Sequence, residues 1–145
     1  MGLDMYLNAK RYLWHSEDEL SSKIGSVFPE LGDSRVKEIT AELMYWRKSN
    51  AIHKWFVDNV QDGVDECQES WLSREQLEQL LEVVNQVLAD KKKAGALLPP
   101  QAGFFFGSDK VDEWYWQDLQ VTKEALNKIL AMDLKGWDLY YRASW

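Results

Sequence analysis

The sequence predicts a single α+β domain over residues 1–145, in which a small, mainly antiparallel sheet of about four strands packs against three helices. Segments with apolar residues at every second position, typical of strands, lie near both ends of the chain. Segments with apolar residues three and four apart, typical of helices, lie between them. This grouping favours an α+β class, although a parallel β-α-β pair inside the chain stays open.

Three segments carry the strand pattern, at residues 3–14, 36–46 and 137–145. The middle segment is rich in β-branched and aromatic residues, which favour strands. Strict alternation along it would place two sets of side chains on opposite faces of the sheet. One set is Ile39, Ala41, Leu43 and Tyr45, and the other is Thr40, Glu42, Met44 and Trp46.

The first two predicted helices have recognisable starts. One begins at an N-cap, Ser49 or Asn50, and ends near residue 61. The other begins with a capping box formed by Ser73 and Gln76, ahead of leucines and valines at helical spacing. It ends near the basic run 91–93, which complements the negative end of the helix dipole.

The third predicted helix follows a break at two consecutive prolines, Pro99 and Pro100. It spans about residues 110–132, and Ser108 or Asp109 is its expected cap. Residues 18–24 favour a further short helix.

Composition limits the classes of function. The chain has 145 residues, 46% of them hydrophobic, which suffices for a real core. Its 24 acidic and 17 basic residues give a net charge of -7, which opposes broad binding to nucleic acid. An alternative is that the acidic residues face the basic surface of a nucleic-acid-binding protein, but here the acids are scattered along the chain.

Because Cys67 is the one cysteine and no apolar run is long enough for a bilayer, we expect a cytoplasmic protein without membrane contact.

The segment YWRKSNAIHKWF, residues 45–56, is the densest group of candidate binding residues. It supplies Trp46, Arg47, Asn50, Lys54 and Trp55 as candidates for contact with a ligand or partner. Indole and guanidinium groups stack on planar molecules, and guanidinium also binds carboxylate or phosphate. The same residue types dominate protein interfaces, so a small ligand and a protein partner both stay open.

A second aromatic cluster, GFFFGSDKVDEWYW at residues 103–116, adds Phe106 and Ser108 as candidates. The turn amides, the following helix start and Lys110 suit an anion, but the neighbouring acids weaken this hypothesis. The structural alternative is that residues 104–106, three phenylalanines, wedge the loop onto the core, two inward and one outward.

An enzyme is the alternative function, with His53 as general acid or base and Asp118 as its catalytic partner. His53 falls at the boundary between the apolar and polar sides of its helix, where an imidazole can contact both solvent and packed neighbours. Asp118 falls on an apolar helix side, so we expect it to pair with Arg47, Lys54 or His53. A core hydrogen bond for His53 and a structural ion pair for Asp118 are the competing interpretations.

The sequence has no metal-ligand spacing and no cofactor fingerprint, so we predict no metal and no cofactor. The acidic segment 62–69 lacks the ligand order of a calcium loop. We therefore expect it to be a solvated loop.

Four segments together resemble a family of small proteins found in tailed phages, prophages and some bacterial genomes. They are MGLDMYL, YWRKSNAIHKWF, GFFFGS followed by DEWYW, and YYRASW, and the similarity spans nearly the whole chain. The resemblance implies a phage-related protein in the host cytoplasm and implies no mechanism. It is most recognisable at Arg47, Asn50, His53, Trp55, Gly103, Phe106, Gly107 and Asp118.

The leading hypothesis is an accessory binding protein. It would occupy a host protein, such as a defence or regulatory factor, or sequester a small nucleotide-like molecule between the two aromatic clusters. The abundant tryptophans fit a monomer or a homodimer. The enzyme hypothesis, with an anionic substrate, requires Arg47, His53 and Asp118 to converge in one cleft.

Overall fold

The computed structural model describes residues 2–103 and 105–145, and it confirms the α+β class. Four strands form one sheet in the order β2-β1-β4-β3. Each neighbouring pair is antiparallel, so the parallel pair that the sequence left open does not occur in the described part of the chain. The strands are β1 (Asp4–Tyr12), β2 (Glu38–Arg47), β3 (Ser70–Leu72) and β4 (Asp138–Ser144).

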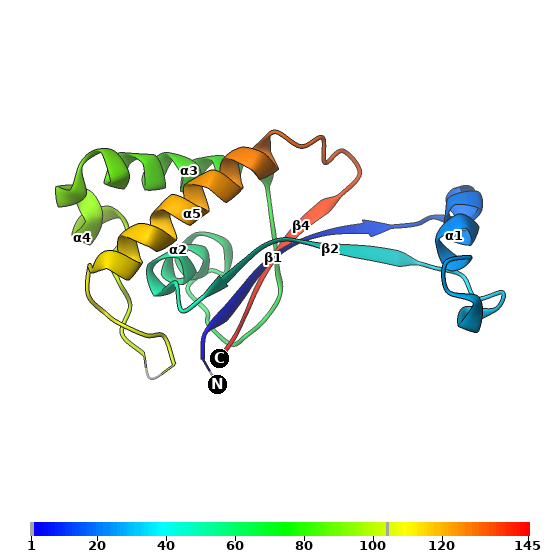
Figure 1. Ribbon diagram of the computed structural model, residues 1–145, viewed down its shortest axis with the longest axis horizontal. Coiled ribbons are helices and arrows are strands. Elements are labelled where there is room, and N and C mark those ends of the chain that lie inside the picture. The colour runs from blue at the N-terminus through cyan, green and yellow to red at the C-terminus, as the bar shows by residue number, and fades with distance from the viewer. Residues whose placement is uncertain (1, 104) are drawn as a thin grey trace.

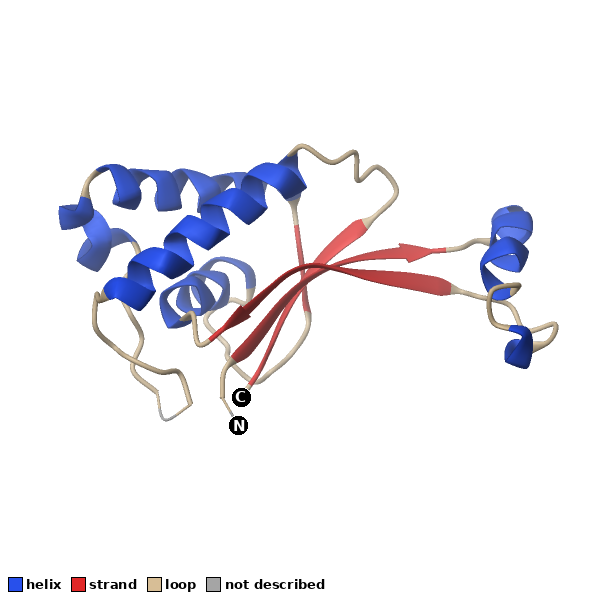
Figure 2. Cartoon of the chain, viewed as in Figure 1, coloured by secondary structure: helices blue, strands red, loops and turns tan. Residues whose placement is uncertain are grey.

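Helices α2 to α5 gather around one part of the sheet, whereas α1 lies at the far end of the molecule (Figure 2). They are α1 (Asp18–Gly25), α2 (Asn50–Val60), α3 (Arg74–Ala89), α4 (Ala94–Leu97) and α5 (Glu113–Leu130). Short 3₁₀ turns span His15–Glu17, Pro29–Leu31 and Lys91–Lys93. Within the described residues, no helix combines the length and apolar character needed to cross a membrane.

Strand β3 and the start of α5 differ from the sequence prediction. β3 has three residues, too few for a periodic pattern to be seen. The N-cap of α5 is Asp112, whose carboxylate accepts a hydrogen bond from Tyr115 N at 3.1 Å, and not Ser108 or Asp109. The earlier residues are taken up by the turn that leads into the helix. By contrast, the capping box of Ser73 with Gln76 forms as predicted.

The alternation predicted for β2 is broken by a bulge. Met44 lies opposite Leu7, but Glu42 lies opposite Asn8, so Leu43 has no partner on β1. An extra residue in one strand moves the following side chains to the other face. The residues of β2 opposite the buried face of β1 are consequently Trp46, Met44 and Ala41, from both predicted sets.

The core lies between the sheet and three helices. β1 contributes alternate residues that are almost fully buried, and β4 adds Leu139, Tyr141 and Ala143 beside them. The facing helices α3 and α5 are amphipathic, and fully burying each leucine of their apolar stripes stabilises the fold by roughly 1.5–3 kcal/mol. Those buried stripes contain Leu77, Leu80, Val84 and Val87 in α3, and Leu119, Leu126 and Ile129 in α5.

The turn before α5 packs partly as predicted. Phe106 is buried, and Phe105 is half-buried against the core. Phe104 lies outside the described residues, so the prediction of two rings inward and one outward is not tested for it. Position 103 favours glycine, because a Cβ atom there would lie only 2.8 Å from the Phe106 ring.

β1 and β2 continue beyond β4 as a two-stranded arm that carries α1 at its end (Figure 1). β4 pairs with β1 up to Lys10, whereas the β1–β2 ladder continues to Tyr12. Residues 13–37, here called the arm tip, expose several large apolar side chains. These are Trp14, Val27, Phe28 and Leu31.

Because the arm tip lies outside the main core, we predict that the body folds without it. Replacing residues 15–35 by Asn-Gly should join the strands through a two-residue hairpin turn. The free energy of unfolding should change by less than about 2 kcal/mol, because no residue of the tip belongs to the core cluster and its ion pairs are all at least partly exposed. Urea unfolding followed by circular dichroism measures this, and loss of cooperative unfolding would contradict it.

Candidate functional site

His53 is buried at 0% exposure, so its predicted boundary position is wrong. Its Nε2 lies 2.9 Å from Asp65 Oδ2, and its Nδ1 lies 2.7 Å from the Tyr141 hydroxyl. Since an ionised carboxylate can only accept, a neutral His53 donates from Nε2 and accepts the Tyr141 proton at Nδ1. The acidic segment predicted to be a solvated loop therefore supplies a structural partner, Asp65.

The surroundings of His53 tie α2 to the sheet. The Tyr141 ring stacks on Phe56 at 3.9 Å between centroids, and Phe106 lies edge-on to His53 at 5.3 Å. Burial raises the pKa of Tyr141 well above its ordinary value, so its hydroxyl keeps the proton that it donates. The core hydrogen bond, one of two interpretations open from the sequence, is what forms.

Three other candidate binding residues make contacts within the protein. Trp46 is buried and donates from Nε1 to Thr122 Oγ1 at 2.8 Å, which fastens β2 to α5. Trp55 is buried in the core beside Phe56. Lys54 pairs with Asp58 at 2.7 Å on the surface of α2, so it does not contact Asp118.

Asn50 joins α2 to the turn before α5. Its amide nitrogen donates to the Phe106 and Ser108 carbonyl oxygens at 3.0 and 2.8 Å, and its Oδ1 accepts from Gln101 N at 2.9 Å. These bonds make the turn one wall of a cavity. The sequence pointed to Asn50 as a ligand contact, but its amide is used within the protein.

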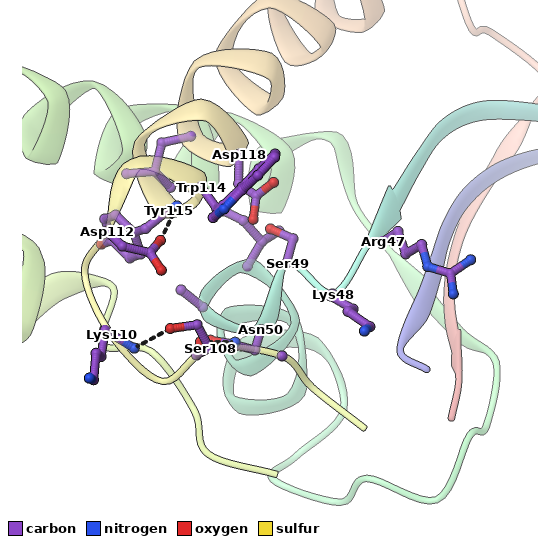
Figure 3. Close-up of a pocket in the computed structure, with 14 residues that line it drawn as sticks. Arg47, Lys48, Ser49, Asn50, Ser108, Lys110, Asp112, Trp114, Tyr115 and Asp118 are labelled. Carbon is purple, nitrogen blue, oxygen red and sulfur yellow. Dashed lines mark hydrogen bonds between the residues drawn. The ribbon is translucent and has the colours of Figure 1, made fainter. Parts of the chain in front are cut away.

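The cavity lies between α2, α5 and the turn, with a volume of about 440 Å³ (Figure 3). We call it the α2–α5 cavity. Pockets of this size hold small organic ligands. It is lined by the basic residues Arg47, Lys48 and Lys110, the acids Asp112 and Asp118, the polar residues Ser49, Asn50 and Ser108, and Gly107, Ala51, Ile52, Trp114, Tyr115 and Leu119.

The N-terminus of α2 opens into this cavity without a cap. Ser49 occupies the N-cap position but makes no capping bond, and its hydroxyl has no hydrogen-bond partner of normal geometry among the described residues. The residue is only 2% exposed. Lys48 before it has a left-handed φ of 57°, which turns the chain sharply from β2 into α2.

Basic side chains surround the cavity without acidic partners. No ion pair found in residues 2–103 and 105–145 includes Arg47, Lys48 or Lys110. Figure 3 shows the charged ends of Arg47, Lys48 and Lys110 all directed away from Ser49 and Asp118, so these three cations lie at the rim. Asp112 is occupied as the cap of α5.

Asp118 is half-buried in the cavity wall and has none of the partners predicted for it. The described ion pairs do not include it, and His53 does not line the cavity. Burial raises the pKa of Asp118 from an ordinary value of 3.8 to about 6, and the nearby Ser49 hydroxyl opposes this rise. The two groups thus face each other, although no hydrogen bond of normal geometry joins them within the described chain.

Sequence reasoning missed Trp114 and Ser49 as cavity residues. Trp114 is 72% exposed and lies beside Asp118 in Figure 3. Its neighbour Tyr115 takes the inward place and donates to Leu98 O at 2.7 Å, and burial raises its pKa to about 12. The string RKSN before an apolar run was the available signal, since it places cations and a hydroxyl at one helix start.

The comparisons found no match for the chain among family models, curated proteins or solved structures. Among the described residues, no group of three His, Cys, Asp or Glu side chains could hold a metal ion. The cavity is therefore interpreted from its own residues.

We predict that Tyr141→Phe destabilises the protein by about 1–3 kcal/mol, because His53 Nδ1 loses its buried donor while the stack on Phe56 stays. Urea unfolding measures the change. Tyr140→Phe is the matched control, since Tyr140 is only half-buried, and it should shift stability by less than about 0.5 kcal/mol. Equal effects of the two substitutions would contradict a structural role for the His53 bond.

Asp118→Asn should stabilise the unliganded protein at pH 7.5 and not at pH 4. The pKa of Asp118 is about 6 in the folded state and 3.8 in the unfolded state. The ionised Asp118 carboxyl therefore destabilises the folded state, and this penalty is fully present once the pH has risen through about 6. Below pH 4 the carboxyl is protonated in the folded state and the penalty is absent. After allowance for partial exposure, we expect a gain of about 1 kcal/mol at pH 7.5. Urea unfolding at both pH values tests this, with Glu124→Gln on the exposed side of α5 as control. A gain of the same size at both pH values would contradict it.

Proposed function

We propose that the protein binds and sequesters a small nucleotide-like molecule in the α2–α5 cavity. The observation that carries this proposal is the ligand-sized cavity at the start of α2, where the buried Ser49 hydroxyl makes no capping hydrogen bond and faces the Asp118 carboxyl. The backbone N–H groups of this first turn therefore have no side-chain acceptor at the N-cap. A ligand in the cavity can supply one.

The rim of the cavity suits the anionic part of such a ligand. The first turn of α2 has backbone N–H groups without intrahelical acceptors, and the helix dipole favours negative charge there. Lys48 and Lys110 lie on either side of this turn and have no acidic partners among the described side chains. Their long stems allow the ammonium groups to swing onto a phosphate.

The exposed Trp114 indole suits the planar part. Stacking of a base on an aromatic side chain contributes roughly 1–3 kcal/mol. Trp114 lies on α5 and the open start of α2 lies across the cavity, so one ligand can contact both. An anionic, planar molecule such as a nucleoside monophosphate matches this pair of features.

The enzyme alternative has less support. Its proposed acid or base, His53, is fully buried and held by Asp65 and Tyr141, away from the cavity. General acid–base catalysis requires hydrogen-bond reach to the substrate. The sequence resembles a family of phage and prophage proteins. A binding protein of that kind would act stoichiometrically in the host cytoplasm, by withholding its ligand from a host defence or regulatory factor.

Direct occupation of a host protein is the second candidate, and the apolar arm tip favours it. Trp14, Val27, Phe28 and Leu31 are exposed at the end of an arm that projects from the body. Large exposed apolar groups in one place are typical of protein contacts. Shortening the arm as described above separates the candidates, because it removes this surface and leaves the cavity intact.

Titration with nucleoside monophosphates, followed by calorimetry, should show saturable binding to the wild type. Lys48→Ala/Lys110→Ala should weaken binding of the monophosphates by about tenfold or more, and binding of the unphosphorylated nucleosides much less. The matched control is Lys92→Ala/Lys128→Ala, which removes two exposed lysines elsewhere. Absence of binding to the wild type would overturn the proposal.

A further inference from the structure

We infer that the α2–α5 cavity binds the phosphate of its ligand together with one proton, which the Asp118 carboxyl takes up from solution. The inference rests on the proposed function, because it names the condition under which the phosphate site at the start of α2 is complete. Two opposing features meet at that helix start, namely free backbone donors and an acid.

The start of α2 leaves backbone donors at the cavity. Ala51 and Ile52 are the second and third residues of the helix, and both line the cavity. Their N–H groups precede the first intrahelical bond, which His53 N donates to Ser49 O at 3.0 Å. The hydrogen bonds found in the described part of the chain give neither group an acceptor. An anion placed there meets these two donors and the positive end of the helix dipole.

Asp118 places an acid at the same helix start. Figure 3 shows its carboxyl on α5 facing Ser49, the N-cap residue of α2. The Ser49 hydroxyl favours the ionised form of this carboxyl, so its hydrogen points at the carboxylate and not at a ligand. An ionised Asp118 therefore opposes an anion at the start of α2 in two ways, by charge repulsion and by engaging the serine donor.

Protonation of Asp118 reverses both effects. A neutral carboxyl has no charge and carries an O–H donor, which can reach a phosphate oxygen in the same cavity. The Ser49 hydroxyl then no longer faces a carboxylate, so it can donate to that phosphate as well. The protonated site adds these two side-chain donors to the N–H groups of Ala51 and Ile52.

The proton is available at moderate pH. Burial raises the pKa of Asp118 from 3.8 to about 6, and the negative charge of Asp112 adds to this rise. A phosphate bound beside Asp118 raises that pKa further, because like charges in a half-buried cavity disfavour each other. Binding therefore takes up a proton, and by linkage the affinity falls as the pH rises above about 6.

The other ionisable groups of the cavity are placed differently. The three cations have their charged ends at the rim, directed away from Ser49. The Asp112 carboxylate caps α5, and the Tyr115 hydroxyl donates to Leu98 O. Helix α3 packs against α5, but none of its described residues lines the cavity. Besides Asp118, the charged or titratable residues of the lining are Arg47, Lys48, Lys110, Asp112 and Tyr115.

The test is calorimetry with AMP at pH 5.5 and pH 7.5, on the wild type and Asp118→Asn. Asparagine has no charge and keeps a donor, so it imitates the protonated carboxyl at both pH values. At pH 7.5 the variant should bind AMP at least about tenfold more tightly, because the wild type must first protonate Asp118. At pH 5.5 the two affinities should agree within about threefold. The phosphate of AMP also ionises in this range, but comparing the two proteins at one pH cancels that effect.

Calorimetry at pH 7.0 in PIPES and in imidazole counts the protons, since the two buffers differ in ionisation enthalpy. The wild type should take up at least about half a proton more per AMP than Asp118→Asn. Glu124→Gln is the matched control, because it removes one acid from the exposed side of α5 and should behave as the wild type. A role of Asp118 in folding alone would leave the proton count unchanged.

Ser49→Ala provides a second variant. Without the hydroxyl the ionised Asp118 is less favoured, so the pH at which AMP affinity starts to fall should rise by about half a unit. If the affinity ratio of wild type to Asp118→Asn is the same at both pH values and their proton counts agree, the proton inference is overturned and the nucleotide-binding function stands. If no nucleoside monophosphate binds to either protein at either pH, both are overturned.

Discussion

Tyr141 is the point at which the sheet, α2 and the loop after α2 are held together. Its ring stacks on Phe56, and its hydroxyl hydrogen-bonds to His53, which in turn bonds to Asp65. Two residues of one helix, three positions apart, are thereby fixed to a single side chain of β4. Because this attachment sets the position of α2, it also sets where the start of α2 opens, and the cavity depends on it.

A comparison of two serines shows how the cavity arises. Ser73 and Ser49 both occupy N-cap positions, but only Ser73 accepts a hydrogen bond from its helix, from Gln76 N at 3.2 Å. A capping serine typically stabilises its helix by about 1 kcal/mol. The start of α2 forgoes that contribution, although the attachment through His53 and Phe56 keeps the helix in place. This buried, uncapped helix end, with Lys48 directly before it, is the feature on which the proposed ligand site rests.

The elements with strong local signals could be predicted from the sequence, and the site could be predicted only in part. Strands β1, β2 and β4 and the three long helices follow from apolar periods and from caps such as Ser73, whereas β3 is too short to show a period. The face reversal in β2 could not be predicted, because the bulge at Leu43 depends on pairing with β1. His53 likewise depends on Asp65 and Tyr141, which are 12 and 88 residues away in the sequence. Part of the segment 45–56 lines the cavity, and the buried hydroxyl there comes from Ser49, one of its less distinctive residues.

The charge distribution adds a constraint on the size of the proposed ligand. The lining has three basic and two acidic residues, whereas the whole chain carries a net charge of -7. At physiological ionic strength, electrostatic interactions are screened over about 8 Å. A mononucleotide inside the cavity would therefore experience mainly the charges of the lining and the start of α2, whereas a nucleic acid would extend over the acidic surface outside it. This arrangement favours a single nucleotide over a polymer, and it does so through electrostatics rather than through the shape of the cavity.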